Sequence, residues 1–155
     1  MAGLLLCYLS CLSMKIINFF KENTKYNLQN KKKLRELIEI VCKKEGKMIV
    51  CLNLILCDDD YLKEINKKHL KKTYYTDVIS FDFKDKENNV EGDIYVSVDR
   101  TKENAEKFKT KHQIEILRVI THGVLHLIGY NDKTKKEKEI MTQKENKYIS
   151  LYKNS

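Results

Sequence analysis

Apolar residues recur three or four positions apart in five stretches of this chain, and that spacing predicts amphipathic helices. In the first stretch the apolar residues fall on one helical face, and Gly46 follows as a natural stop. The five predicted helices cover residues 30–45, 59–70, 99–110, 111–128 and 134–152.

Side chains that cap helices stand at three of the predicted starts. Asp58 can accept a hydrogen bond from the first turn of the second helix, and Asp99 or Thr101 can do so for the third. Thr134 and Glu137 have the spacing of a capping box, which begins the last helix.

Four shorter segments have the patterns of β-strands. Residues 15–20 form a short apolar segment, and residues 48–57 form a long apolar run that is typical of a central strand. Residues 76–83 and 93–98 alternate between the two faces, with polar residues 84–89 between them. The last two segments are therefore predicted to form an antiparallel hairpin.

The elements follow one another as strand, helix, strand, helix, two strands and three helices. This order predicts an α/β (α+β) fold in which a four-stranded mixed sheet packs with about five helices. With 155 residues, 42% of them hydrophobic, the chain is expected to form a single compact domain over residues 14–155. Residues 1–13 are uncharged and too short to span a bilayer, so we expect a non-structural extension there and a working start at Met14.

The cysteines indicate a reducing compartment. They are five in number, an odd count, and no Cys-x-x-Cys pair occurs. Cys42, Cys51 and Cys57 lie in apolar runs, as reduced core residues do. We therefore expect a cytoplasmic protein without a disulfide framework and without a membrane partner.

Two of the four histidines, His122 and His126, are one helical turn apart inside an apolar predicted helix. Both rings can therefore project from one face and bind one ion. Gly123 stands where a His-Glu-x-x-His metalloprotease has its glutamate, so peptidase chemistry is not expected. The pair alone is equally compatible with two histidines hydrogen-bonded at the edge of a core, and His112 is expected on the helix surface.

The residues after the pair favour the metal interpretation. Gly129 can end the helix in a left-handed conformation, and the chain can then turn and bring Asp132 back toward the rings. Two imidazoles and one carboxylate would leave the other coordination positions open to water.

The run from His122 to Asp132 resembles the signature of the YbeY-type endoribonucleases, a family of metal-dependent rRNA maturation factors. The family run reads His-Gly-x-Leu-His-Leu-x-Gly-Tyr-Asp-His, and the chain departs from it at the last two positions, Asn131 and Asp132. A second family stretch precedes it in the expected order, as Thr-Asp-Val-Ile-Ser-Phe over residues 76–81 and Gly-Asp-Ile over residues 92–94. The resemblance covers most of the chain and implies the same compact fold.

The resemblance also implies a function. It is that of a single-strand-specific endoribonuclease that processes the 3′ end of 16S rRNA and takes part in ribosome quality control. One divalent metal, foremost Zn²⁺, would be bound by His122, His126 and Asp132, which would act through the metal-bound water. Asp132 replaces a family histidine, and its carboxylate makes the site more anionic and more favourable to harder metals. Asp77 is a further candidate as an outer partner of the site, and its alternative role is to orient a strand turn.

The net charge of +8 fits a polyanionic partner, here an rRNA precursor on the ribosomal small subunit. The residues expected to bind RNA are Lys68, His69, Lys71 and Lys72, which precede the Thr-Asp stretch. The family often has an arginine at the position of Leu70, so its role must pass to these neighbours or be lost. Solvated helix faces are the alternative interpretation of the lysine clusters.

Two other functions remain open from the sequence. The protein could be a ribosome-associated RNA-binding assembly factor in which the metal is structural, because such a factor would share the basic surface and the metal. It could also be a different metal-dependent hydrolase.

Overall fold

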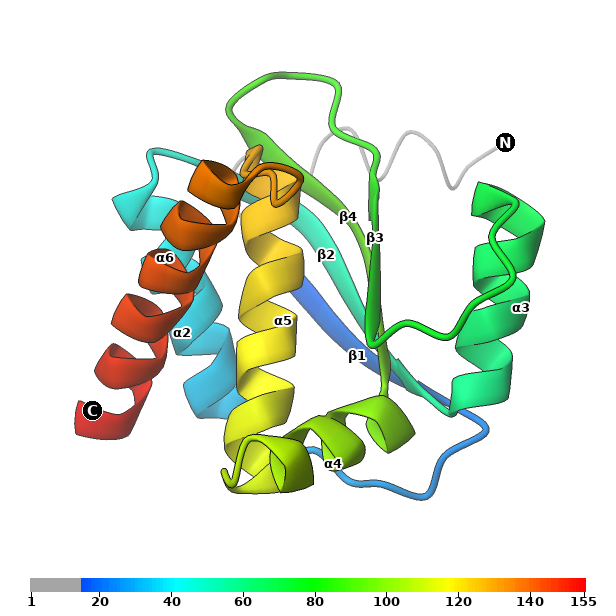
Figure 1. The fold of residues 1–155 in the computed structure, drawn as a ribbon. Helices are drawn as coiled ribbons and strands as arrows, with labels where there is room; N and C mark the ends of the chain where they lie inside the picture. Colours follow the sequence, from blue (N-terminus) through cyan, green and yellow to red (C-terminus); the bar gives the residue numbers. More distant parts are fainter. Residues whose placement is uncertain (1–14) are drawn as a thin grey trace.

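The structure is a computed structural model that describes residues 15–155, so the extension expected at residues 1–13 lies outside the described part. Four strands and five helices follow one another in the predicted order (Figure 1). Their bounds are β1 Ile16–Glu22, α2 Lys31–Lys44, β2 Met48–Cys57, α3 Asp59–Leu70, β3 Val78–Asp82, β4 Asn89–Ser97, α4 Val98–Lys107, α5 His112–Ile128 and α6 Lys135–Asn154.

The strands form one mixed sheet in the order β1-β2-β4-β3. The pairs β1–β2 and β2–β4 are parallel, whereas β3 and β4 form the predicted antiparallel hairpin. The apolar run of β2 is therefore central, and β3 is an edge strand. This confirms the α/β (α+β) fold with a four-stranded mixed sheet and five helices.

The helices divide between the two faces of the sheet. Helices α2, α5 and α6 lie together on one face, and α3 covers part of the other (Figure 1). Leu52 and Leu54 of β2 belong to the main core with α2, α5 and α6, whereas Cys57 and Ile79 pack with Leu62 of α3 in a smaller cluster. Most of α5 is buried because it lies between the sheet and the two outer helices.

Two of the predicted caps are confirmed and one is corrected. The Asp58 carboxylate accepts a hydrogen bond from the amide of Tyr61, and Thr134 forms its capping box with Glu137. Helix α4 begins earlier than predicted because the Ser97 hydroxyl, not Asp99 or Thr101, accepts from its first turn. Thr101 is instead buried inside the helix.

The hairpin strands also differ in length from the prediction. Strand β3 starts at Val78, where its pairing with β4 begins, rather than at residue 76, and the side chain of Asp77 is held by Asn104 of α4. Strand β4 starts at Asn89 rather than at residue 93, because its first residues pair with β2 from Met48 onward. Between residues 15 and 155, none of the helices is long and apolar enough to cross a membrane.

Candidate metal centre

Helix α5 carries two histidines near its C-terminal end, and the following turn returns a carboxylate to them. The Nε2 atoms of His122 and His126 are 2.9 Å apart. Gly129 ends the helix with a φ of +116°, and its amide donates to the carbonyl of Leu125. The chain then reverses, so that Asp132 Oδ2 lies 3.4 Å from Nε2 of His122 and 3.6 Å from Nε2 of His126.

These three atoms have the spacing of ligands around a small divalent ion. Two metal–ligand bonds of about 2.0–2.1 Å that meet at the tetrahedral angle place their ligand atoms about 3.3–3.4 Å apart. The observed separations of 2.9, 3.4 and 3.6 Å lie around that value. The three residues could therefore hold one metal ion, and over residues 15–155 theirs is the one group of three such side chains whose ligand atoms converge.

The outer ring nitrogens show that this group suits a cation. Nδ1 of His122 lies 2.6 Å from a carboxylate oxygen of Glu145, and Nδ1 of His126 lies 2.9 Å from the carbonyl oxygen of Tyr130. An ionised carboxylate and a carbonyl can only accept, so each Nδ1 carries a proton, and in a neutral ring the Nε2 atom then presents the lone pair. When both rings are neutral, their lone pairs and the Asp132 carboxylate repel one another, and a cation among them removes the repulsion.

The charges around the two rings give them opposite pKa shifts. Burial lowers the pKa of His122, but the hydrogen bond and charge of Glu145, with the charges of Asp132 and Asp77, raise it overall above its ordinary value. Burial and the neighbouring His122 lower the pKa of His126, and Asp132 offsets this only in part. The surrounding charges therefore favour protonation of His122 and disfavour protonation of His126.

Asp77 lies near this group without joining it. The Asn104 side-chain amide donates to its carboxylate at 3.1 Å, and the amide of Ser97 donates to its carbonyl at 2.9 Å. Its carboxylate is thus oriented by α4, while its charge still contributes to the raised pKa of His122.

The expected RNA-binding residues lie away from the three converging side chains. They stand at the end of α3 and just after it, on the face of the sheet opposite to α5 (Figure 1). Lys68, His69, Lys71 and Lys72 are all exposed. The ring of His69 meets the ring of Phe81 edge-on, with centroids 5.5 Å apart.

His112 is not the surface residue expected from the sequence. Its Nε2 lies 3.0 Å from the hydroxyl of Thr101, and its ring packs against Tyr26 with centroids 5.1 Å apart. It therefore joins α4 to α5, and it takes no part in the metal group.

Glu145 is the site residue that the sequence analysis missed. It lies on the buried stripe of α6, and its carboxylate reaches His122 across 23 positions of sequence. A glutamate in an otherwise apolar helical stripe is the signal that could have pointed to it, because a buried carboxylate needs a partner.

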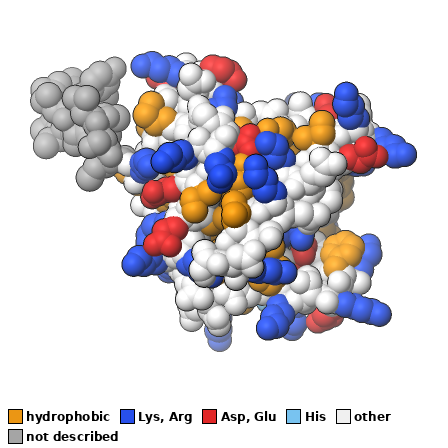
Figure 2. Space-filling model, turned by 90° about the vertical axis from the view of Figure 1, so that its left-hand side faces the viewer, with side chains coloured by type: hydrophobic (Ala, Val, Ile, Leu, Met, Phe, Trp, Pro, Cys, Tyr) orange, Lys and Arg blue, Asp and Glu red, His pale blue; other side chains and the backbone are white. Residues whose placement is uncertain are grey.

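Positive charge is not confined to the end of α3. Figure 2 shows the side of the molecule that α2 and α6 form, where Lys and Arg side chains alternate with acidic and hydrophobic ones. Lys31 and Lys32 of α2 are exposed, as expected for a solvated helix face. The net charge of the protein therefore does not identify which surface a polyanion such as RNA would contact.

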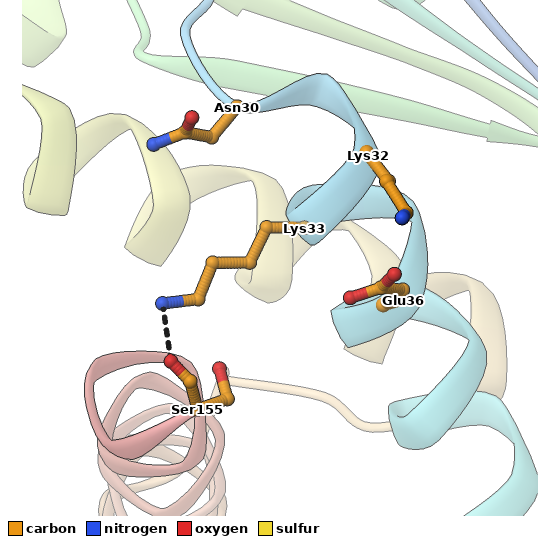
Figure 3. Close-up of a pocket in the computed structure, with 5 residues that line it drawn as sticks. All are labelled: Asn30, Lys32, Lys33, Glu36 and Ser155. Carbon is orange, nitrogen blue, oxygen red and sulfur yellow. Dashed lines mark hydrogen bonds between the residues drawn. The ribbon is translucent and has the colours of Figure 1, made fainter.

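A shallow pocket at the end of α6 is separate from the metal group. It is lined by Asn30, Lys32, Lys33, Glu36 and Ser155, and the Lys33 ammonium donates to the Ser155 carbonyl at 3.1 Å (Figure 3). The pocket lies between α2 and the end of α6, and none of the three converging residues lines it.

Comparisons with known proteins place the chain in a family. A family model described as "Endoribonuclease YbeY" matches residues 16–153. A protein named Endoribonuclease YbeY from Karelsulcia muelleri is 49% identical over 138 residues, covering 89% of this chain and 96% of the relative. Another of that name from Cytophaga hutchinsonii is 45% identical over 137 residues, covering 88% of this chain and 96% of the relative.

A solved structure has the same fold. The solution structure of TM1509 from Thermotoga maritima superposes with a TM-score of 0.63 at 32% identity, covering 88% of this chain and 89% of that chain. The match extends over the strands and helices that build the group of His122, His126 and Asp132. The chain belongs to the endoribonuclease YbeY family.

Proposed function

We propose that this protein is a metal-dependent endoribonuclease that cleaves single-stranded RNA, with the 3′ end of 16S rRNA precursors as substrate and a role in ribosome quality control. The observation that carries the proposal is the convergence of His122, His126 and Asp132 in a member of the endoribonuclease YbeY family. We propose Zn²⁺ as the metal, because imidazole nitrogens and a carboxylate oxygen are a typical zinc ligand set.

The reaction is the hydrolysis of a phosphodiester, in which water adds to phosphorus and one P–O bond breaks. A divalent ion supplies a Lewis acid that polarises a phosphoryl oxygen and acidifies water. His122 and His126 would hold it as neutral ligands, and Asp132 would contribute one negative charge. Asp77 would act from outside this group, through its charge and its hydrogen bond with Asn104.

We place RNA contacts at Lys68, His69, Lys71 and Lys72, which are exposed and stand before β3. Lysines attract the phosphate backbone without sequence preference, so the contact should weaken with salt. The His69 ring can also stack with an unpaired base. These residues would share the role of the family arginine that Leu70 replaces.

The precursor and the ribosomal small subunit are the partners in this proposal, and the cytoplasm is the location. The net charge of +8 supports a polyanionic partner. The buried reduced thiols of Cys42 and Cys57 support a reducing compartment.

One experiment tests the proposal. Metal content and cleavage of a single-stranded 16S precursor oligonucleotide are measured for the wild type, for His126→Ala and for His112→Gln. The matched control, His112→Gln, changes a histidine of the same helix outside the metal group. We expect His126→Ala to lose both metal and cleavage, and the control to keep both.

Two other outcomes would decide against the proposal. Cleavage that persists after complete removal of metal would exclude metal-assisted hydrolysis. A wild-type protein that binds metal and small subunits but cleaves no RNA would be an assembly factor with a structural metal, an alternative that the family does not favour.

A further inference from the structure

The buried face of α6 contains one acidic side chain. Its other buried residues are Met141, Tyr148, Ile149 and Tyr152, whereas Glu145 places a carboxylate among them with 9% of its surface exposed. Burying a carboxylate is costly, and an apolar residue of similar volume often stabilises such a position more. Packing alone therefore does not explain why a glutamate occupies position 145.

The contacts of Glu145 identify its partner. One oxygen lies 2.6 Å from Nδ1 of His122, and the other lies 3.4 Å from the guanidinium of Arg118. Arg118 makes its shorter hydrogen bond, at 2.8 Å, to the side chain of Asn146. The shorter contact of Glu145 is thus with the histidine, and its ion pair with Arg118 is the longer one.

A carboxylate on Nδ1 determines two properties of an imidazole. It keeps the proton on Nδ1, which leaves Nε2 free as a ligand, and it fixes the rotation of the ring. In this structure the fixed ring brings Nε2 of His122 to 2.9 Å from Nε2 of His126 and to 3.4 Å from Asp132.

We propose that Glu145 is a positioning residue for the metal centre, which sets the tautomer and orientation of His122 and so makes metal affinity depend on the packing of α6 against α5. The inference rests on the proposed function only in taking His122 as a metal ligand. His126 needs no such carboxylate, because the Tyr130 carbonyl holds its Nδ1 at 2.9 Å.

The test compares Glu145→Ala, Glu145→Gln and a control, Glu139→Ala, which removes an exposed acid from the same helix. The dissociation constant for Zn²⁺ alone is measured by competition with a chromophoric chelator. We expect Glu145→Ala to weaken binding by about 10–100-fold. Glutamine can still accept from Nδ1, so Glu145→Gln should recover most of the affinity, and the control should match the wild type.

A second measurement tests the proposal on the wild type itself, even if Glu145→Ala does not fold. In the metal-free wild type, ¹⁵N NMR of the His122 ring should show the proton on Nδ1, and in Glu145→Ala the two tautomers should mix. Wild-type Zn²⁺ affinity in a folded Glu145→Ala, or a wild-type ring protonated on Nε2 alone, would overturn the proposal. A wild type that binds Zn²⁺ but cleaves no RNA would instead count against the proposed function and leave this inference standing.

Discussion

Gly123 lies against Ile94 so closely that no side chain fits between α5 and β4. A Cβ atom on Gly123 would lie 2.8 Å from Cγ2 of Ile94 and 3.1 Å from the Ser80 hydroxyl. That hydroxyl also donates to the Gly123 carbonyl at 3.2 Å. Packing therefore requires glycine beside His122, although glycine costs about 1 kcal/mol relative to alanine inside a helix.

Gly123→Ala should consequently destabilise the protein. We expect a loss of about 1–3 kcal/mol from overpacking, and weaker metal binding because the α5 backbone must move at His122. Urea denaturation and Zn²⁺ competition measure the two effects. Helix propensity alone predicts the opposite sign, so a gain of about 1 kcal/mol in the free energy of unfolding would refute the packing argument.

Asp132 stands where the family signature has a histidine, so its role can be tested separately. Asp132→Ala should weaken Zn²⁺ binding by more than about 100-fold, beyond the loss expected for an outer partner. Asp132→His should restore binding, because an imidazole is also a zinc ligand. Isothermal titration with Zn²⁺ gives both affinities.

The control for this change is Asn131→Ala, which alters the exposed neighbour in the same turn. It should bind Zn²⁺ as the wild type does. Equal affinities for Asp132→Ala and Asn131→Ala would show that Asp132 is not a ligand.

Local chemistry explains why much of this fold could be predicted from sequence. The Asp58 cap and the capping box of Thr134 and Glu137 depend on residues three positions apart, so α3 and α6 begin where predicted. The return of Asp132 to the histidines likewise follows from a helix end at Gly129.

Contacts between distant elements could not be predicted in the same way. The start of β4 depends on pairing with β2 at Met48, and the cap of α4 depends on where β4 ends. Glu145 reaches His122 only because α6 packs antiparallel beside α5. The periodicity of α6 identifies its buried face, but it does not show which element packs against that face.

Glu115 should lower stability at neutral pH. It is 3% exposed, and burial raises its pKa above the ordinary 4.5, with Arg118 opposing and the charges of Asp77 and Glu145 adding to the rise. The folded protein therefore holds this proton to higher pH than the unfolded chain, so stability falls as pH rises above about 4.5.

Glu115→Gln removes the buried carboxyl group and, with it, the loss of stability at neutral pH. We expect its melting temperature at pH 7 to rise above that of the wild type, and each ~1 kcal/mol gained would appear as about 2–4 °C in a chain of this size. At pH 4, where Glu115 is mostly protonated in both states, the difference should shrink. Calorimetry at pH 7 and pH 4 measures the two differences in melting temperature. A Glu115→Gln variant that melts below the wild type at pH 7 would contradict this prediction.

A second carboxylate, Glu45, has the opposite shift. It accepts hydrogen bonds from the Tyr130 hydroxyl and the Lys144 ammonium, both at 2.7 Å, and from the hydroxyl of Tyr148. Burial alone would raise the pKa of Glu45, but these three hydrogen bonds lower it to about 2. Because the Tyr130 carbonyl holds His126, this cluster links the end of α2 to the candidate metal centre.

Glu45→Gln should therefore be destabilising in a pH-dependent way. A lowered carboxyl pKa stabilises the fold above the unfolded value of 4.5, and that contribution disappears as pH falls toward about 2. We expect the variant to be about 1.5–3 kcal/mol less stable at pH 7, with the difference shrinking between pH 4.5 and pH 2. Urea denaturation across this range measures it, with Glu39→Gln as an exposed control that should show little change. A difference that stays constant down to pH 2.5 would show that Glu45 does not contribute through its charge.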